Sequence, residues 1–336
     1  MAASVRDVAE AAGVSVGTVS NVLNRPDKVS EATVSRVQDA IDRLGFVRND
    51  AARQLRAGRS RTIGLVVLDL HNPFFSDVAR GAEERAEREG LSVLVANSDE
   101  KQTRETAHLD LFEEQRVVGV LVTPVGDDIR RLRRMREHGI PAVLVDRESQ
   151  DAAFASVAVD DLEGGRLAAE HLLQLGRRRL MFAGGPISLR QVSDRLEGAQ
   201  RAVAGCPGAT LEFVGTEALT VEDGRRAAER ITARDAAGRP DAVFAANDLI
   251  ALGLLQGLLQ TREIRVPDDI ALIGYDDIEF AAAAVVPLSS IRQPAQLIGA
   301  TAVELLLGLE PESAADGERR HVVYRPELVV RASTAG

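Results

Sequence analysis

Apolar residues at helical spacing open the chain. The first run recurs at the three- and four-residue intervals of one helix face: Val5, Val8, Ala9 and Ala12. Gly13 ends this run, and Ser4 with Asp7 three residues later gives an acidic variant of the capping box at its start. Two further serines stand where a second and a third helix should begin: Ser15 and Ser30. The pattern predicts a three-helix unit whose last helix covers residues 31–44.

After Thr62 the pattern changes to apolar, β-branched runs that alternate with amphipathic helical stretches. The candidate strands cover residues 63–70, 91–98, 117–124, 141–146, 179–185, 211–215, 241–247 and 270–277. Nearly continuous apolar strands separated by helices are typical of a parallel sheet that is covered on both faces. Because so many units exceed one comfortable sheet, we expect an α/β body of two similar lobes that divide near residues 155–165.

Polar residues follow several of the predicted strands. They are Asp69, Asn97, Asp146, Asn247, Asp276 and Asp277. The carboxyl ends of parallel strands carry the binding loops of open sheets, so these residues predict a polar ligand cleft between the lobes. A role as helix caps or turn residues explains about half of them equally well.

The segment 5–24 has the form of a helix-turn-helix. Ala9 is small where the two helices should cross, and Gly13 permits an unusual turn backbone. The residues expected to face the core are Val14, Val19 and Leu23. The opposite face of the second helix can then enter a DNA major groove, where Asn21 offers an amide to adenine and Val16 reaches a thymine methyl. The expected DNA contacts are Ser15, Val16, Gly17, Thr18, Ser20 and Asn21.

Charge adds a local feature to this picture. A net charge of −10 argues against nucleic acid as a partner of the whole molecule. Residues 43–61, however, hold six arginines and one acid, Asp50. A basic stretch joined to an acidic body suits a DNA-binding arm, although a solvated linker has the same composition.

Several other classes of protein lack support. No apolar run approaches the ~20 residues of a membrane span, and the first residues lack the basic start and apolar core of a secretory signal, so we expect a cytoplasmic protein. Cys206 is the only cysteine, which excludes an intrachain disulfide and a thiolate zinc site. The five histidines show no paired ligand spacing. We therefore expect neither a metal nor a cofactor.

Two enzyme classes and one transport class compete with DNA binding. Residues 13–17 match the GxSxG elbow of hydrolases, but a helix precedes them where that elbow needs a strand. No GxGxxG follows a candidate strand and no P-loop occurs, so neither dehydrogenase nor nucleotide chemistry is supported. A solute-binding protein of a transporter would share the two-lobed body, but the missing export signal and residues 4–60 argue against it.

Long and short stretches resemble the lactose/galactose repressor (LacI/GalR) family. The long ones are VAEAAGVSVGTVSNVLN and KVSEATVSRVQDAIDRLGFVRNDAARQLRAGRS. The short ones are NPFF, VDR, GGRLAAEHL, FAGG, AANDLIALG, GYDD and SSIRQP. Together they span about residues 4–330, so the resemblance covers almost the whole chain.

The resemblance implies three regions and a homodimer. The regions are a helix-turn-helix headpiece (1–47), a hinge helix with its linker (48–60), and a body similar to periplasmic sugar-binding proteins (61–336). The lobes would interleave: lobe one covers about 61–160 plus about 292–330, including a last helix at 295–307 and closing strands near 321–330, and lobe two covers 161–290. Two headpieces of a dimer would read a near-palindromic operator.

In the hinge stretch, the resemblance implies three DNA contacts: Asn49, Ala52 and Leu55. Asn49 would cap a short helix, and Leu55 would wedge into a minor-groove step. A dimer contact between two hinges is the other interpretation of Leu55, and the two are compatible.

The resemblance also implies an effector site between the lobes. Its residues are Asn72, Phe74, Phe75, Asp146, Asp160, Arg195, Asn247, Asp276 and Gln293. Carboxylates accept from vicinal hydroxyls and Arg195 donates two parallel bonds, which suits a sugar. Near Leu219 the chain has aliphatic residues where many sugar-binding relatives have an aromatic, so we expect polar bonds and Phe74 or Phe75 to hold the ligand. Its binding would alter operator affinity allosterically, as inducer or as corepressor.

Overall fold

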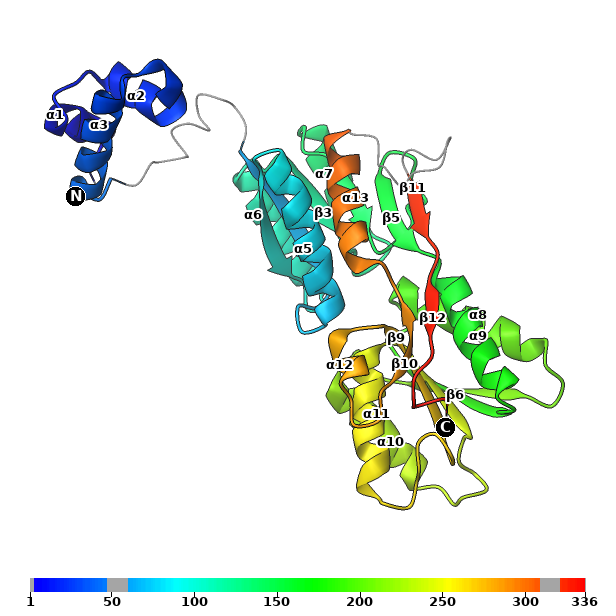
Figure 1. The fold of residues 1–336 in the computed structure, drawn as a ribbon. Helices are drawn as coiled ribbons and strands as arrows, with labels where there is room; N and C mark the ends of the chain where they lie inside the picture. Colours follow the sequence, from blue (N-terminus) through cyan, green and yellow to red (C-terminus); the bar gives the residue numbers. More distant parts are fainter. Residues whose placement is uncertain (1–2, 47–59, 309–320, 336) are drawn as a thin grey trace. The chain divides into compact units, whose positions relative to one another are not determined.

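The computed structural model describes residues 3–46, 60–308 and 321–335 of the chain (Figure 1). They form two compact units, residues 1–60 and 61–336. The hinge contacts Asn49, Ala52 and Leu55 lie outside the described residues, so the hinge helix stays a prediction. No described helix has the length and apolar character needed to cross a membrane.

The first unit is the predicted three-helix domain. Its elements are α1 (Val5–Ala11), α2 (Val16–Asn24), a 3-10 turn (Pro26–Lys28) and α3 (Glu31–Leu44). The capping box is confirmed, because Asp7 Oδ2 accepts from the Ser4 backbone N–H at 2.7 Å and Ser4 Oγ accepts from that of Asp7 at 3.4 Å. Val19 is fully buried as expected, but its neighbour in the core is Val22 rather than Leu23. Position i+3 lies on the face that meets the other helices, and Leu23 lies at its margin.

The first lobe of the body is a six-stranded parallel sheet in the order β11-β5-β4-β3-β1-β2. Its strands are β1 (Thr62–Val67), β2 (Ser92–Asn97), β3 (Gly119–Val122), β4 (Ala142–Val145), β5 (Ala155–Val159) and β11 (His321–Tyr324). Its helices are α5 (Pro73–Arg88), α6 (Gln102–Glu114), α7 (Arg130–Glu137) and α13 (Ala295–Leu307). The central strands are buried along their whole length, since helices cover both faces.

The second lobe is a six-stranded sheet in the order β12-β10-β9-β8-β6-β7. Its strands are β6 (Arg179–Gly184), β7 (Thr210–Gly215), β8 (Ala242–Ala245), β9 (Ala271–Asp276), β10 (Ser289–Arg292) and β12 (Glu327–Val329). Its helices are α8 (Asp161–Gln174), α9 (Arg190–Ala204), α10 (Val221–Thr232), α11 (Asp248–Gln260) and α12 (Glu279–Ala282). All strands are parallel except β12, which runs antiparallel to β10.

The chain crosses between the lobes three times, after β5, after β10 and after β11 (Figure 1). The closing strands therefore separate: β11 pairs with β5 in the first lobe, whereas β12 pairs with β10 in the second. The expectation that residues 292–330 all lie in lobe one is wrong for β12. Backbone pairing of Leu328 with Ile291 fills the open edge of β10, which the sequence pattern does not reveal.

Glycines allow α8 and α9 to cross closely beside the lobe interface. A Cβ atom at Gly198 would lie 2.0 Å from the backbone oxygen of Leu162, and one at Gly165 would lie 2.0 Å from that of Arg195. Both contacts are with backbone, which cannot turn away as a side chain can. This crossing brings Arg195 next to the start of α8.

We predict that Gly198→Ala lowers the unfolding free energy by at least about 2 kcal/mol, because the added methyl group forces the two helices apart. Chemical denaturation measures the effect. Gly205→Ala is the matched control at the end of the same helix, where the nearest atom outside the adjacent residues lies 3.5 Å from the added Cβ. Equal stabilities of the two variants would contradict the close crossing.

Candidate functional site

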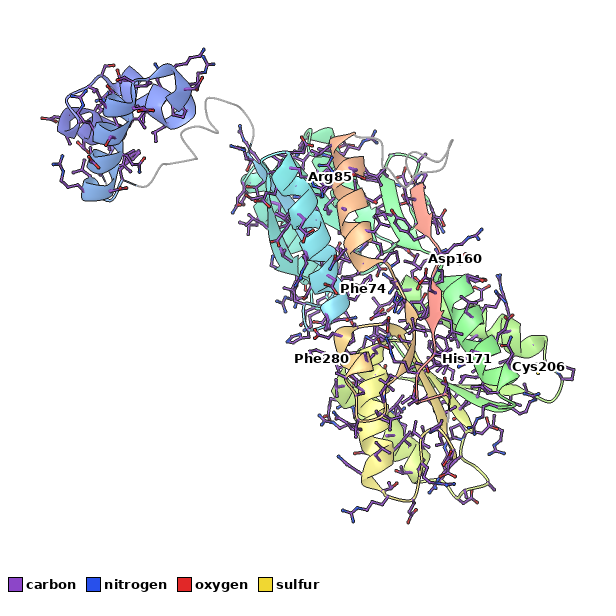
Figure 2. All side chains as sticks on the ribbon, viewed as in Figure 1. Phe74, Arg85, Asp160, His171, Cys206 and Phe280 are labelled. Carbon is purple, nitrogen blue, oxygen red and sulfur yellow. The ribbon has the colours of Figure 1, made fainter. Side chains whose placement is uncertain are left out.

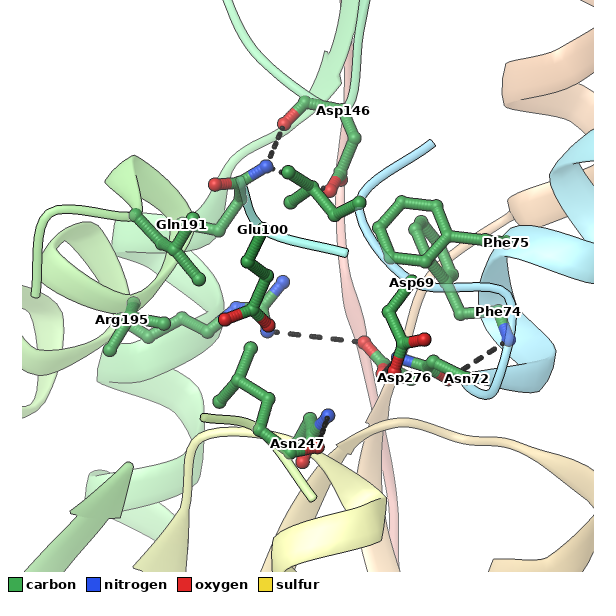
Figure 3. A pocket seen from close by; sticks show the side chains of 14 residues that line it. Asp69, Asn72, Phe74, Phe75, Glu100, Asp146, Gln191, Arg195, Asn247 and Asp276 are labelled. Carbon is green, nitrogen blue, oxygen red and sulfur yellow. Dashed lines mark hydrogen bonds and ion pairs between the residues drawn. The ribbon is translucent and has the colours of Figure 1, made fainter. Parts of the chain in front are cut away.

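A cavity lies between the two lobes, at the carboxyl ends of their strands (Figure 3). Seven of the nine expected effector residues line it: Asn72, Phe74, Phe75, Asp146, Arg195, Asn247 and Asp276. Seven residues outside that set also line the cavity: Leu68, Asp69, Glu100, Leu189, Gln191, Val192 and Leu219. Of these, Asp69 is one of the polar strand-end residues that the sequence analysis expected in the cleft.

The first lobe contributes Asn72 and two phenylalanines at the start of α5. Asn72 caps this helix, since its Oδ1 accepts from the backbone N–H of Phe74 at 3.0 Å. Its Nδ2 donates to Asp276 Oδ2 at 2.8 Å, which is a hydrogen bond from one lobe to the other. The rings of Phe74 and Phe75 meet edge to face at 5.0 Å and form an apolar wall of the cavity.

Arg195 is buried and holds several elements of the second lobe together. Its Nε donates to Asp161 Oδ1 at 2.7 Å, and its Nη1 donates to the backbone oxygen of Ala246 at 2.8 Å. The guanidinium lies 3.7 Å above the ring of Tyr275 and 3.9 Å from Asp276 Oδ1. The protein itself therefore occupies much of the donor capacity that the sequence analysis assigned to a ligand.

Two expected effector residues do not line the cavity. Asp160 is exposed at the start of α8, where its Oδ1 accepts from the backbone N–H of Glu163 at 2.9 Å (Figure 2). The next residue, Asp161, is the buried one that pairs with Arg195, because consecutive residues at a helix start point in different directions. Gln293 contacts a cavity residue instead of the cavity itself, since its Nε2 donates to Asp276 Oδ1 at 2.7 Å.

Asp146 and Asp276 are buried carboxyls on opposite lobes. Burial raises the pKa of Asp276 to about 6, although Arg195 acts in the other direction. Burial, reinforced by repulsion from Asp161, raises the pKa of Asp146 well above its usual range. Gln191 donates from Nε2 to both the backbone oxygen and Oδ2 of Asp146 at 2.9 Å. Asp146 Oδ1 has no hydrogen-bond partner among the described residues.

Glu100 and Asp69 add two further carboxylates, both from loops of the first lobe. Burial raises the pKa of Glu100 to about 7, and repulsion from three carboxylates adds to this effect: Asp69, Asp99 and Asp223. Asp69 follows a predicted strand, which is the pattern that indicates a cleft residue. No such pattern indicates Glu100, which lies in the turn after β2 with a left-handed φ of 54°.

The loop that presents Asp276 is strained and clamped. Asp276 and Asp277 have φ values of 103° and 57°, which L-residues rarely adopt. Asp248, fully buried at the start of α11, accepts from the backbone N–H of Ile278 through Oδ2 at 2.9 Å and from Ser290 Oγ through Oδ1 at 2.7 Å. Ser290 Oγ in turn accepts from the backbone N–H of Asp277 at 3.0 Å. These bonds fix the loop and hence the Asp276 carboxyl.

In the first unit, the outer face of α2 carries the expected DNA contacts. Val16 is 43% exposed, and Gly17 and Asn21 are also exposed. Thr18 and Ser20 are half-buried. Ser15 Oγ caps the helix by accepting from the backbone N–H of Thr18 at 3.1 Å. This face has the apolar and amide groups that read base edges. No cluster of potential metal ligands occurs among the described residues of either unit.

Comparison with known proteins gives two family matches. Residues 4–49 match "Bacterial regulatory proteins, lacI family", and residues 169–334 match "Periplasmic binding protein-like domain". Among curated relatives, the chain is 33% identical to an HTH-type transcriptional repressor PurR of Vibrio atlanticus over 98% of each chain. It is 36% identical to the ribose operon repressor of Bacillus subtilis over 91% of each.

Solved structures give the same picture. The lac repressor dimer bound to operator and the anti-inducer ONPF has a TM-score of 0.80 at 28% identity, with full coverage of both chains. A LacI family transcriptional regulator from Enterococcus faecium with bound ribose has a TM-score of 0.71 at 26% identity, covering 82% of this chain and 98% of that one.

We predict that Glu100→Gln stabilises the protein increasingly as pH rises. The folded chain keeps the Glu100 proton up to about pH 7, whereas the unfolded chain releases it near 4.5, so ionisation destabilises the fold across this window. The gain should be absent below pH 4.5 and reach about 1–3 kcal/mol at pH 8, allowing for partial solvent exposure. Thermal unfolding at pH 5 to 8 measures it. Glu114→Gln, an exposed change on α6, should give no pH-dependent difference.

We predict that Asp248→Ala loosens the loop of Asp276. The backbone N–H of Ile278 loses its acceptor and Ser290 loses its partner, so amide hydrogen exchange in residues 274–281 should accelerate at least tenfold. Mass spectrometry of peptides from this segment measures the rate. Ser290→Ala removes the acceptor of the Asp277 N–H and the donor to Asp248 Oδ1 but keeps the bond from Ile278 to Asp248, so it should give a smaller change. Unaltered exchange in Asp248→Ala would refute the clamp.

Proposed function

Because the chain belongs to the LacI family of bacterial regulatory proteins, we propose that it represses transcription as a homodimer under the control of a sugar. The observation that carries this proposal is the combination of an exposed recognition helix in one unit with a polar cavity between the two lobes of the other. A solute-binding protein has no use for the helix-turn-helix of residues 4–49, and the named relatives are repressors.

The recognition helix is α2. Asn21 presents an amide that can form two hydrogen bonds with the major-groove edge of an adenine, and Val16 can cover a thymine methyl group. The capped start of α2 directs backbone N–H groups outward, which suits a phosphate oxygen. Two copies of the headpiece in a dimer bind two related half-sites, so the operator is near-palindromic.

The cavity suits a molecule that donates several hydrogen bonds. Asp146 Oδ1 offers a free acceptor, and Asn247 adds a neutral polar side chain at the second-lobe wall. The apolar wall of Phe74 and Phe75 can cover the C–H face of a sugar ring. The ribose bound in the Enterococcus faecium regulator is a ligand of this kind in a structurally similar protein.

Hydrogen bonds across the cavity supply the means of control. Asn72 bonds to Asp276, and Gln191 bonds to Asp146, each from one lobe to the other. A sugar that competes for these groups changes the relative free energies of different lobe arrangements. Coupling to the operator then equals the difference in sugar affinity between the operator-compatible arrangement and the others. Its sign decides whether the sugar induces or corepresses.

The test is selection of an operator from random duplexes with the full-length chain, followed by titration with monosaccharides. We expect a near-palindromic consensus and at least one sugar that changes operator affinity tenfold or more. Failure to enrich any palindrome, with or without sugars, would overturn the proposal.

We predict that Asn21→Ala weakens operator binding about 10- to 100-fold, because the loss of one bidentate contact to a base costs about 1–3 kcal/mol. Gel-shift titration measures the affinity. The thermal stabilisation of the same variant by the sugar should equal that of the wild type. Gln38→Ala is the matched control, since it removes an exposed amide from α3 of the same unit. Equal losses in both variants would contradict the assignment of α2.

A further inference from the structure

We infer that the cavity selects a sugar without negative charge, which is either a neutral, unphosphorylated sugar or an amino sugar. Glu100 and Asp69 enforce this selection. The inference rests on the proposed sugar binding and adds the charge class of the ligand. It follows from the balance of charges at the cavity, from one unsatisfied acceptor, and from the surroundings of the two loop carboxylates.

Carboxyl groups dominate the polar part of the cavity wall. Four line it: Asp69, Glu100, Asp146 and Asp276. Above pH 7, Glu100 is ionised and adds its negative charge to that of Asp69. Arg195 is the one cation among the described lining residues, and it is already bonded to Asp161 and to the backbone oxygen of Ala246. Since Asp161 balances its charge, the guanidinium leaves little positive potential for an anion. A phosphate or carboxylate group entering this space would meet like charges in a partly dehydrated site.

The unsatisfied acceptor points to a donor on the ligand. Asp146 is 97% buried, its Oδ1 has no hydrogen-bond partner among the described residues, and the side chain lines the cavity (Figure 3). A buried acceptor without a partner destabilises the protein until a donor reaches it. Hydroxyl and ammonium groups supply such a donor. A fully ionised phosphate group has no hydrogen to donate.

Glu100 and Asp69 lack a neutralising cation inside the cavity. The nearby cations are bound elsewhere: Lys101 and Arg104 pair with Asp99, and Arg226 pairs with Asp223. Asp69 is bonded to the exposed ring of His71, which lies outside the cavity lining. The group of the ligand that faces these two carboxylates is therefore a hydrogen donor, and an ammonium there gains an attraction that a hydroxyl of similar size lacks.

The experiment uses matched sets of sugars with the full-length chain. Each set contains a parent monosaccharide, amino derivatives and a phosphate ester. The first set is glucose, glucosamine, mannosamine, which is the 2-epimer of glucosamine, and glucose 6-phosphate. Ribose with ribose 5-phosphate, and galactose with galactosamine and galactose 6-phosphate, complete the panel. Isothermal titration calorimetry at pH 8, where Glu100 is ionised, gives the dissociation constants. In the set that binds, we expect the phosphate ester to bind at least 30-fold more weakly than the parent, and one amino derivative to bind at least as tightly.

Glu100→Gln separates charge from size, because the two side chains have nearly the same shape. In this variant the ratio of the dissociation constant of the phosphate ester to that of the parent sugar should fall at least fivefold. The ratio of the parent's dissociation constant to that of the amino derivative should also fall. Asp69→Asn repeats the test if Glu100→Gln does not fold. Glu114→Gln removes the same charge from the far end of α6 and should leave both ratios unchanged.

Three results are distinguishable. A phosphate ester that binds within threefold of its parent, or a penalty that Glu100→Gln leaves unaltered, overturns the charge selection while sugar binding stands. Absence of binding by every sugar overturns the proposed function, and the charge selection falls with it. A penalty that shrinks in Glu100→Gln and persists in Glu114→Gln supports the inference.

Discussion

The buried guanidinium of Arg195 is the interaction on which the cavity depends. It lies on α9 and joins three other parts of the second lobe: Asp161 at the start of α8, Ala246 after β8, and Tyr275 in β9. A buried charge is tolerated only where donors and acceptors are satisfied around it. The close glycine crossing of α8 and α9 supplies this geometry. The close packing at these glycines thus positions the Arg195 guanidinium, and its bonds hold the second-lobe wall of the cavity in place.

The remaining carboxyls of the cavity are arranged at a cost to stability. Burial raises the pKa of Asp146, Asp276 and Glu100, which means that folding disfavours their charged forms. A structure optimised for stability alone would replace such groups by apolar ones. Their presence at one interface between two lobes, with a strained backbone at Asp276 held by Asp248, is typical of a binding site.

Features that depend on local sequence pattern were predicted correctly. All eight proposed strands exist, α3 and α13 have the expected bounds, and the capping box at Ser4 is present. The strands that local pattern did not predict depend on pairing with a neighbouring strand. β5 (155–159) lacked the long apolar run of its neighbours, and β12 is a three-residue strand defined only by β10 beside it. Sequence pattern alone does not show that Asp161 rather than Asp160 faces inward, because the direction of each side chain at a helix start depends on tertiary packing.

Sequence pattern also does not show that the cavity residues are bonded to one another, and these bonds affect the affinity for a ligand. Residues expected to bind a ligand bind each other across the cavity, as Asn72 does with Asp276. Ligand binding is then an exchange of hydrogen bonds rather than a simple gain, so the net affinity reflects the difference between ligand bonds and the bonds that they replace. Such an exchange makes a modest binding free energy sufficient for control, because every bond broken between the lobes also removes a constraint on their relative orientation.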